Sequence, residues 1–319
     1  MIDFNPNKQQ EKLINNLDGI LLSDAGPGTG KTFTISLRYA NILSSREVTP
    51  EDILLITFTN NAAENMKERI INNCEYDKSS LREAPISTFH SLCNGILQRH
   101  GFEAPTILGT DDRITHTTKI IENEVLELEE FNNFIQRFID KHPEYTDFYR
   151  IIRNFGDLLG LIKSLAAKGI FPKKEGWFRN SERYLEGDYQ KFLKEFKKMN
   201  EQEGNRQSEL RSKLNRYKNK CFVKSSPRCE EIRGEGKKVP KKVAQIAFEE
   251  DRNELKQFVH NLYYEYVEYA LSRNYMNFSF IMMFTFALLC ENHSLREKLR
   301  KEYVMIDEFQ DTNEIQFKL

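Results

Sequence analysis

The chain has 319 residues, of which 39% are hydrophobic, enough for one or two domains with substantial cores. Its formal net charge is −1, which excludes a strongly basic protein, although charge can still be concentrated locally. The five cysteines are scattered without C-x-x-C spacing, which argues against a disulfide framework and a zinc site. We therefore expect a globular protein in a reducing, cytoplasmic setting.

Two features argue against a membrane location. The N-terminus lacks a basic segment followed by an apolar core. The longest apolar run, residues 280–290, is too short to span a bilayer. We expect this run to form a buried helix, and we expect no membrane partner.

The N-terminal part of the chain contains a glycine-rich loop between a predicted strand and a predicted helix. The apolar run 20–22 has the length of a buried strand, and residues 32–43 contain no Gly or Pro and predict a helix. The loop between them, residues 25–32, reads Ala-Gly-Pro-Gly-Thr-Gly-Lys-Thr, which matches the phosphate-binding pattern [AG]-x-x-x-x-G-K-[ST]. A glycine-rich turn without a phosphate has the same letters, but the flanking elements favour the phosphate loop.

The residue types in this loop suit a bound nucleotide. Gly28 and Gly30 allow backbone N–H groups to turn toward phosphate oxygens, and the helix N-terminus adds partial positive charge. Lys31 is expected to reach the β and γ phosphates, and the Thr32 hydroxyl to face Mg²⁺. We predict that these residues, with Thr29, bind a nucleotide, and that ATP and Mg²⁺ are the cofactors.

Two more strand and helix units follow. Residues 53–58 predict a strand, and a helix over residues 62–71 is expected to be capped by Asn60 or Asn61. Residues 86–88 predict a short strand, and residues 89–100 a helix that ends at Gly101. Strands that alternate with helices predict an α/β fold with a parallel sheet flanked by helices.

The middle of the chain has a different character. Apolar residues recur at helical spacing from about residue 112 to residue 261, which predicts a largely helical region. Within it, residues 191–243 contain 17 Lys and Arg against 7 Asp and Glu. This stretch is either a solvated or disordered surface, or a nucleic-acid patch in which Tyr217 and Phe222 stack among the lysines.

The chain returns to α/β character near its end. Residues 303–306 predict a strand, and Asp307 and Glu308 follow directly. Two adjacent carboxylates are costly to desolvate without a cation or hydrogen-bond donors. In a protein with a phosphate loop, we expect Asp307 to hold Mg²⁺ and Glu308 to polarise the attacking water. A solvated strand end is the alternative.

Five segments, in this order, carry a resemblance to a known family. They are Gln10, the loop 25–32, Thr57-Phe58-Thr59-Asn60 with Ala62-Ala63, Thr88-Phe89-His90-Ser91, and Asp307-Glu308-Phe309-Gln310-Asp311-Thr312. The chain resembles the N-terminal half of superfamily 1 DNA helicases of the UvrD/Rep type. The resemblance is close over residues 4–112 and 262–317 and weak between them.

The resemblance implies a fold and a catalytic site. It implies a P-loop RecA-like domain, residues 1–112 plus 283–319, which is incomplete because the chain ends shortly after the Asp-Glu-Phe-Gln-Asp motif. It also implies a large, mostly helical inserted domain, residues 113–282. Gln10 would contact the adenine base, and Gln310 would sense the γ phosphate or couple it to DNA. Lys31, Glu308 and Gln310 would be catalytic.

The resemblance also implies contacts with DNA. The residues expected to contact a single strand are Phe58, Thr59, Asn60, Thr88, Phe89 and His90. Phe58 offers a stacking face, and hydroxyl, amide and imidazole groups can hold phosphates without reading sequence. Alternatively, Phe58 and Phe89 are core aromatics. The implied partners are single-stranded DNA or a junction of duplex and single strand, with repair or defence proteins unspecified. RNA as the track stays open, because these residues carry no test of the 2′-hydroxyl.

Three departures from the family pattern bear on function. Asn61 stands where the family usually has Lys, and residues 277–280, Asn-Phe-Ser-Phe, stand where many relatives have Asp-Phe-x-Asp. The chain ends at Leu319, so we expect it to lack efficient ATPase and unwinding activity by itself. The full-length protein is expected to be an ATP-dependent DNA helicase or translocase. The alternatives are a helicase-nuclease subunit of the RecB or AddA kind and a non-motor module that binds DNA or a partner.

Overall fold

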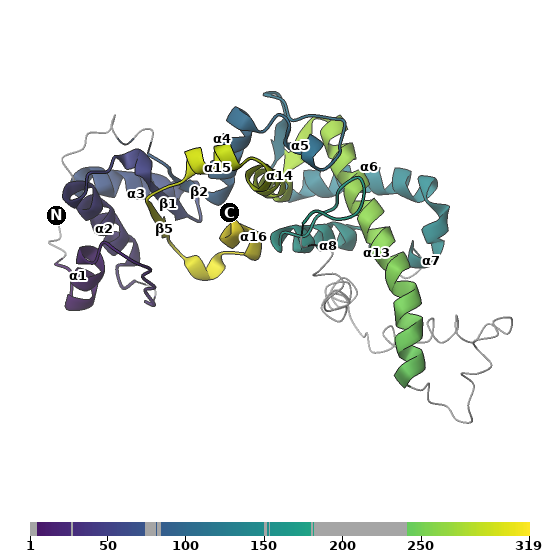
Figure 1. Cartoon of the computed structure of the whole chain (residues 1–319), viewed down its shortest axis with the longest axis horizontal. Coiled ribbons are helices and arrows are strands. Elements are labelled where there is room, and N and C mark those ends of the chain that lie inside the picture. The colour runs from purple at the N-terminus through teal and green to yellow at the C-terminus, as the bar shows by residue number, and fades with distance from the viewer. Residues whose placement is uncertain are drawn as a thin grey trace. The chain divides into compact units, whose positions relative to one another are not determined.

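The computed structural model describes residues 5–26, 28–73, 81, 84–149, 152, 154–179, 181 and 241–319. The basic stretch 191–243 lies outside them, apart from the backbone of its last three residues. The chain divides into two compact units (Figure 1). Unit 1 comprises Met1–Gly101 and Thr285–Leu319, and unit 2 comprises Phe102–Phe284.

Unit 1 contains a three-stranded parallel sheet in the order β2-β1-β5, which confirms the predicted parallel α/β arrangement. The strands are β1 (Ile53–Thr57), β2 (Ile86–Thr88) and β5 (Tyr303–Ile306). The register pairs Thr57 with Thr88 and Ile56 with Ile306. The carboxyl ends of all three strands therefore meet at one edge of the sheet.

The helices of unit 1 follow the predicted strand and helix alternation. Those predicted over residues 32–43, 62–71 and 89–100 are confirmed as α2, α3 and α4. The elements are α1 (Lys8–Asn15), α2 (Lys31–Ser45), η1 (Pro50–Asp52), α3 (Asn60–Asn73), α4 (Phe89–His100), α15 (His293–Leu299), η3 (Phe309–Asp311) and α16 (Glu314–Lys318). Thr88 starts α4 because its hydroxyl accepts the backbone N–H of Ser91.

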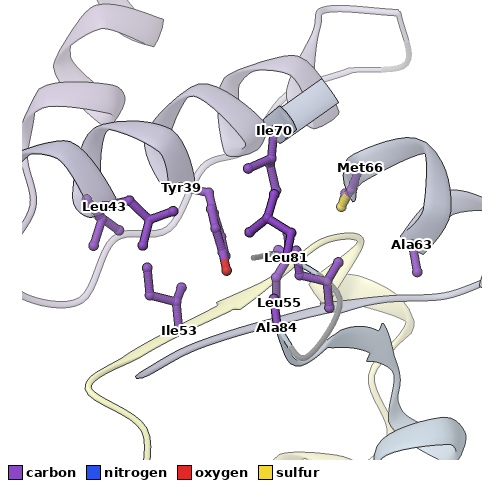
Figure 2. Close-up of a cluster of buried hydrophobic side chains, with 11 residues drawn as sticks. Tyr39, Leu43, Ile53, Leu55, Ala63, Met66, Ile70, Leu81 and Ala84 are labelled. Carbon is purple, nitrogen blue, oxygen red and sulfur yellow. The ribbon is translucent and has the colours of Figure 1, made fainter. Parts of the chain in front are cut away.

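A hydrophobic cluster packs helices α2 and α3 on the sheet. Figure 2 shows their side chains directed toward the strand that carries Ile53 and Leu55, both fully buried. Burying an aliphatic side chain of this size contributes roughly 1.5–3 kcal/mol. The Tyr39 hydroxyl donates to the Pro50 carbonyl at 3.3 Å, so its polar end is satisfied inside the cluster. This cluster holds the helix that follows the glycine-rich loop against β1.

The strand predicted for residues 20–22 is wrong. These residues form no strand in the described part of the chain, and Ile20 and Leu22 are 103% and 83% exposed. The physical reason is that a parallel strand needs a hydrogen-bonded neighbour, and the described sheet ends at β5 and β2. Apolar composition alone therefore does not make this segment a strand.

The described residues of unit 2 are mostly helical, as the apolar spacing predicts. Its elements are α5 (Ala104–Ile107), β3 (Lys119–Ile121), α6 (Glu124–Lys141), η2 (Pro143–Tyr145), α7 (Thr146–Tyr149), α8 (Gly156–Ala167), α13 (Lys241–Ser272) and β4 (Tyr275–Asn277). Phe131, Phe134 and Phe138 are buried along one face of α6. β3 and β4 form a two-stranded parallel sheet that the sequence did not indicate.

The apolar run 280–290 lies in α14 (Phe278–Glu291), and most of its residues are buried, which confirms the predicted buried helix. Among the described residues, no single helix is both long and apolar enough to cross a membrane. α14 and α15 pass that test only as a pair, and they are bent by 109° at the break between them.

Candidate nucleotide and nucleic-acid site

Most of the residues predicted for the site lie just after the three parallel strands. Residues 58–60 follow β1, residues 89–91 follow β2, and Asp307 and Glu308 follow β5. Open parallel sheets bind ligands outside the carboxyl ends of their strands. The fold thus brings to one edge of the sheet residues that the sequence separates by up to 250 positions.

The glycine-rich loop has the backbone that its composition predicts. Gly28 and Gly30 have φ angles of +75° and +84°, a region that residues with a Cβ rarely adopt. The Thr29 hydroxyl donates to the Gly26 carbonyl at 2.7 Å, which tightens the turn. Lys31 is the first residue of α2, so the free backbone N–H groups of the helix start lie at the end of the loop.

Lys31 and Glu308 form an ion pair at the sheet edge. The Lys31 Nζ lies 3.0 Å from Glu308 Oε2, although the two residues are 277 positions apart. The Gln310 amide donates to the same carboxylate oxygen. These hydrogen bonds, from Gln310 and then from Lys31, lower the pKa of Glu308. Glu308 is therefore ionised at neutral pH, and it contacts the other two predicted catalytic side chains, Lys31 and Gln310.

Asp307 is buried beside this ion pair, with 6% of its surface exposed. Its backbone N–H donates to the Ile56 carbonyl at 2.9 Å, which continues the β1–β5 ladder. Burial raises the pKa of Asp307, and the charge of Glu308 raises it further. A backbone hydrogen bond from Glu308 and the charge of Lys31 oppose this shift. A desolvated carboxylate of this kind favours a bound cation, so the residue fits a Mg²⁺ ligand.

The turn after Asp307 is strained. Glu308 has φ +53°, a left-handed conformation that is unusual for a residue with a side chain. This backbone ends the strand and begins the short helix η3, so that Glu308 is directed to Lys31. Thr32 is half-buried in the first turn of α2, and its proposed contact with Mg²⁺ stays a prediction. Among the described residues, no group of three or more His, Cys, Asp or Glu side chains could hold a metal by itself.

Gln10 reaches the glycine-rich loop from α1. Its amide donates to the Thr29 carbonyl at 3.0 Å, while its carbonyl oxygen accepts the backbone N–H of Asn7 at 2.8 Å in a capping box. Gln10 is therefore placed beside the loop by its own helix start. A contact with the adenine base stays a prediction.

Two side chains that the sequence analysis did not single out hold α1 in place. The buried Arg38 guanidinium donates to the carbonyls of Leu13 and Asn16, and the Asn41 amide donates to the carbonyl of Ile14 at 2.9 Å. Both residues lie on α2, and the carbonyls belong to the C-terminal end of α1. No local sequence signal indicates this arrangement, because it depends on how the two helices pack.

The segment after β1 is exposed. Phe58 is 49% exposed, and Thr59 and Asn60 are also exposed. The predicted helix cap was wrong, because the Thr59 hydroxyl accepts the Ala62 N–H at 3.1 Å and Asn60 already lies in α3. An exposed aromatic face and polar groups on one loop are compatible with a nucleic-acid strand.

The segment after β2 is more buried. Thr88 and Phe89 are 7% and 8% exposed, and Thr88 caps α4. His90 is half-buried, and burial lowers its pKa. The DNA contacts expected of Thr88, Phe89 and His90 stay predictions.

Asn277, which stands where many relatives have Asp, makes hydrogen bonds in unit 2 that suit an amide. Asn277 is 2% exposed, and its amide donates to Glu127 Oε1 at 2.8 Å. Its own oxygen accepts the backbone N–H of Phe280 at 2.8 Å. Glu127 is also buried and is paired with Lys163 at 2.6 Å. An Asp at position 277 would place a second carboxylate against Glu127, so the amide suits this site better.

The chain is similar to known proteins. Residues 6–319 match the family described as UvrD/REP helicase N-terminal domain. The chain is 34% identical over 133 residues to a probable DNA helicase of Mycoplasma pneumoniae, an alignment that covers 39% of the chain and 25% of that protein. It is 32% identical over 160 residues to the ATP-dependent DNA helicase PcrA of Staphylococcus aureus, covering 45% of the chain and 22% of that protein.

A probable DNA helicase II homolog of Mycoplasma capricolum is 26% identical over 315 residues, which cover 98% of the chain. The chain spans 31% of the length of that relative and smaller shares of the other two. The family match runs through the glycine-rich loop, the exposed segment after β1 and the carboxylates after β5. This chain therefore belongs to the UvrD/REP helicase N-terminal domain family.

Proposed function

We propose that this chain supplies the nucleotide-binding half of an ATP-dependent DNA helicase that moves along single-stranded DNA. The 3.0 Å contact between Lys31 Nζ and Glu308 Oε2 carries the proposal. It joins the last part of the glycine-rich loop to the carboxylates at the sheet edge. Helicase names among the relatives, including the ATP-dependent helicase PcrA, support the assignment.

In this proposal, unit 1 forms most of the first RecA-like motor domain, and the helical region is a domain inserted into it. The assignment is residues 1–112 and 283–319 for the motor domain and 113–282 for the insertion. The compact units, which divide after residues 101 and 284, support it. The parallel sheet, with the glycine-rich loop and the carboxylates in the same unit, also supports it.

The chemistry follows from the geometry of these side chains. Gly28, Thr29, Gly30 and the start of α2 direct backbone N–H groups to the phosphates, and Lys31 leaves Glu308 to bind the β and γ phosphates. Glu308, ionised because its pKa is lowered, then accepts a hydrogen bond from the attacking water. Thr32 and Asp307 would hold Mg²⁺, which neutralises phosphate charge when bound.

We propose roles for three other side chains, two toward the nucleotide and one toward DNA. Gln310 and Lys31 both donate a hydrogen bond to Glu308 Oε2. We propose that Gln310 senses the γ phosphate. Gln10 binds the loop at Thr29, and we propose that its amide reads the adenine ring. The exposed Phe58 stacks on a base of single-stranded DNA or of a junction.

The test is nucleotide affinity with a matched pair of lysine variants. Lys67 is 24% exposed and pairs with Glu64 at 3.1 Å, against 25% and 3.0 Å for Lys31 and Glu308. The chain is titrated with Mg²⁺ and a fluorescent ATP analogue. Lys31→Ala should weaken binding about tenfold or more, since a hydrogen bond to a charged group contributes roughly 1.5–3 kcal/mol. Lys67→Ala should leave the affinity unchanged, and equal affinities for both variants would overturn the proposal.

A further inference from the structure

A chain of hydroxyl groups connects the ends of β1 and β2. The Thr88 hydroxyl donates to the Ser91 hydroxyl at 2.9 Å, and the Ser91 hydroxyl donates to Asn60 Oδ1 at 3.1 Å. Asn60 begins α3 after β1, and Ser91 lies in the first turn of α4 after β2. Residues 31 positions apart are thus coupled at the sheet edge.

The direction of these hydrogen bonds decides which end of the Asn60 amide is available. The Thr88 oxygen already accepts the backbone N–H of Ser91 at 3.1 Å, and its own proton goes to Ser91. Ser91 then directs its proton to the Asn60 oxygen. The Asn60 oxygen is occupied, and among the described residues its NH₂ group has no hydrogen-bond partner. Because Asn60 is exposed, two N–H donors are available to a ligand.

A nucleic-acid backbone is the ligand that fits these donors. Phosphate oxygens only accept hydrogen bonds, and neutral side-chain donors contact them without reading sequence. Without Ser91, the amide can rotate by 180° and present its oxygen, which a phosphate repels. Phe58, two residues before Asn60, is exposed on the same loop.

We propose that Ser91 is a positioning residue that orients the Asn60 amide toward a backbone phosphate of single-stranded DNA. The proposal rests on the proposed helicase function, but it assigns Ser91 a role that is separate from direct contact. Since Asn60 carries no charge, it releases no counterion, and its contribution to affinity is independent of salt concentration.

The test uses the chain and a fluorescein-labelled oligo(dT) strand, with Asn60→Ala, Ser91→Ala and the double variant. Each single variant should weaken binding about fivefold, the effect of one neutral hydrogen bond. The double variant should be no weaker than Asn60→Ala, because Ser91 acts only through Asn60. Ser91→Thr, which keeps a hydroxyl, should restore affinity. The slope of log affinity against log salt should not change.

Ser45→Ala is the matched control. The Ser45 hydroxyl also donates to an asparagine Oδ1, that of Asn41, at 3.0 Å, but at the end of α2. Its loss should leave DNA affinity unchanged. If Ser91→Ala binds DNA like the wild type while Asn60→Ala does not, the positioning role is wrong and the helicase proposal stands. Additive losses would show an independent DNA contact by Ser91 and also overturn it. If the wild-type chain does not bind the strand, both proposals fail.

Discussion

Lys31 and Glu308 neutralise each other across 3.0 Å, so the lysine that is expected to bind phosphate is paired with a carboxylate in this structure. Both side chains are partly exposed, at 25% and 35%, and solvent therefore weakens their attraction. A triphosphate, with several negative charges, competes effectively for Lys31.

Removal of the competing carboxylate should therefore tighten nucleotide binding. We predict that Glu308→Gln increases the affinity for a fluorescent ATP analogue up to about fivefold, since pairs of this exposure contribute about 0.2–1 kcal/mol. Glu64→Gln, which removes the partner of Lys67, is the control and should have no effect. A weaker affinity of Glu308→Gln would show that the carboxylate supports nucleotide binding rather than competing with it.

The left-handed backbone of the loop makes Gly30 sensitive to substitution. At φ +84°, Gly30→Ala should destabilise the folded chain by about 1–2 kcal/mol and weaken ATP binding, because a Cβ disfavours this conformation. Gly95→Ala is the control, and it should change the free energy of unfolding in the opposite direction. Gly95 lies inside α4 with open space around it, so alanine should stabilise the helix by up to about 1 kcal/mol. Urea unfolding measures both, and an unaffected Gly30→Ala would contradict the loop geometry.

The buried Asp307 predicts a pH-dependent stability difference. Because its folded pKa is raised, its ionisation opposes folding as pH rises from 3.8, the ordinary value, through the folded pKa. Asp307→Asn should therefore be more stable than the wild type at neutral pH, and this advantage should shrink as pH falls toward 3.8. Urea unfolding of the chain without nucleotide, at a series of pH values, measures the difference.

At Asp52, the same urea experiment should give a stability difference of the opposite sign from that at Asp307. The Asp52 carboxylate accepts the backbone N–H and the hydroxyl of Thr49, both at 2.8 Å, and these bonds lower its pKa. Asp52→Asn should be less stable than the wild type at neutral pH. The deficit should disappear as pH falls through the lowered pKa. If both variants shift in the same direction, the proposed environments are wrong.

The Asn277 amide should be required as a donor in unit 2. Asn277→Asp keeps the acceptor for Phe280 N–H but sets a carboxylate against Glu127, and it should destabilise the chain by roughly 1–3 kcal/mol at neutral pH. Adding Glu127→Gln to this variant restores a donor opposite the new carboxylate. The double variant should recover part of the loss, as a double-mutant cycle of unfolding free energies would show.

Phe58 should contribute to binding of single-stranded DNA by stacking. We predict that Phe58→Ala weakens oligo(dT) binding by about 1–3 kcal/mol, the range for one stacked base. Phe317→Ala removes another exposed aromatic side chain, 71% exposed on α16, and should have no effect. A loss with Phe317→Ala and none with Phe58→Ala would move the contact away from the end of β1.

Local signals explain the parts of the fold that could be predicted. The cap Thr88 and the terminal Gly101 bound α4 at the predicted residues, because both act within one turn of the helix. Local signals did not correctly predict which segments form strands in two other parts of the chain. Residues 20–22 are apolar but are not a strand, and the short pair β3 and β4 was not predicted. In both cases the decisive factor is a neighbouring strand, which composition does not report.

The sequence by itself determined the family, the glycine-rich loop and the alternation of strands and helices, and it predicted which residues form the candidate site. Only the tertiary structure decided which of them meet. The packing of α2 on the sheet brings Lys31 to Glu308 after β5, and the aligned carboxyl ends of β1 and β2 bring Asn60 near Ser91. Burial, which no single residue determines, raises the pKa of Asp307. Contacts and desolvation depend on segments that are distant in the chain, so they arise only when the chain folds.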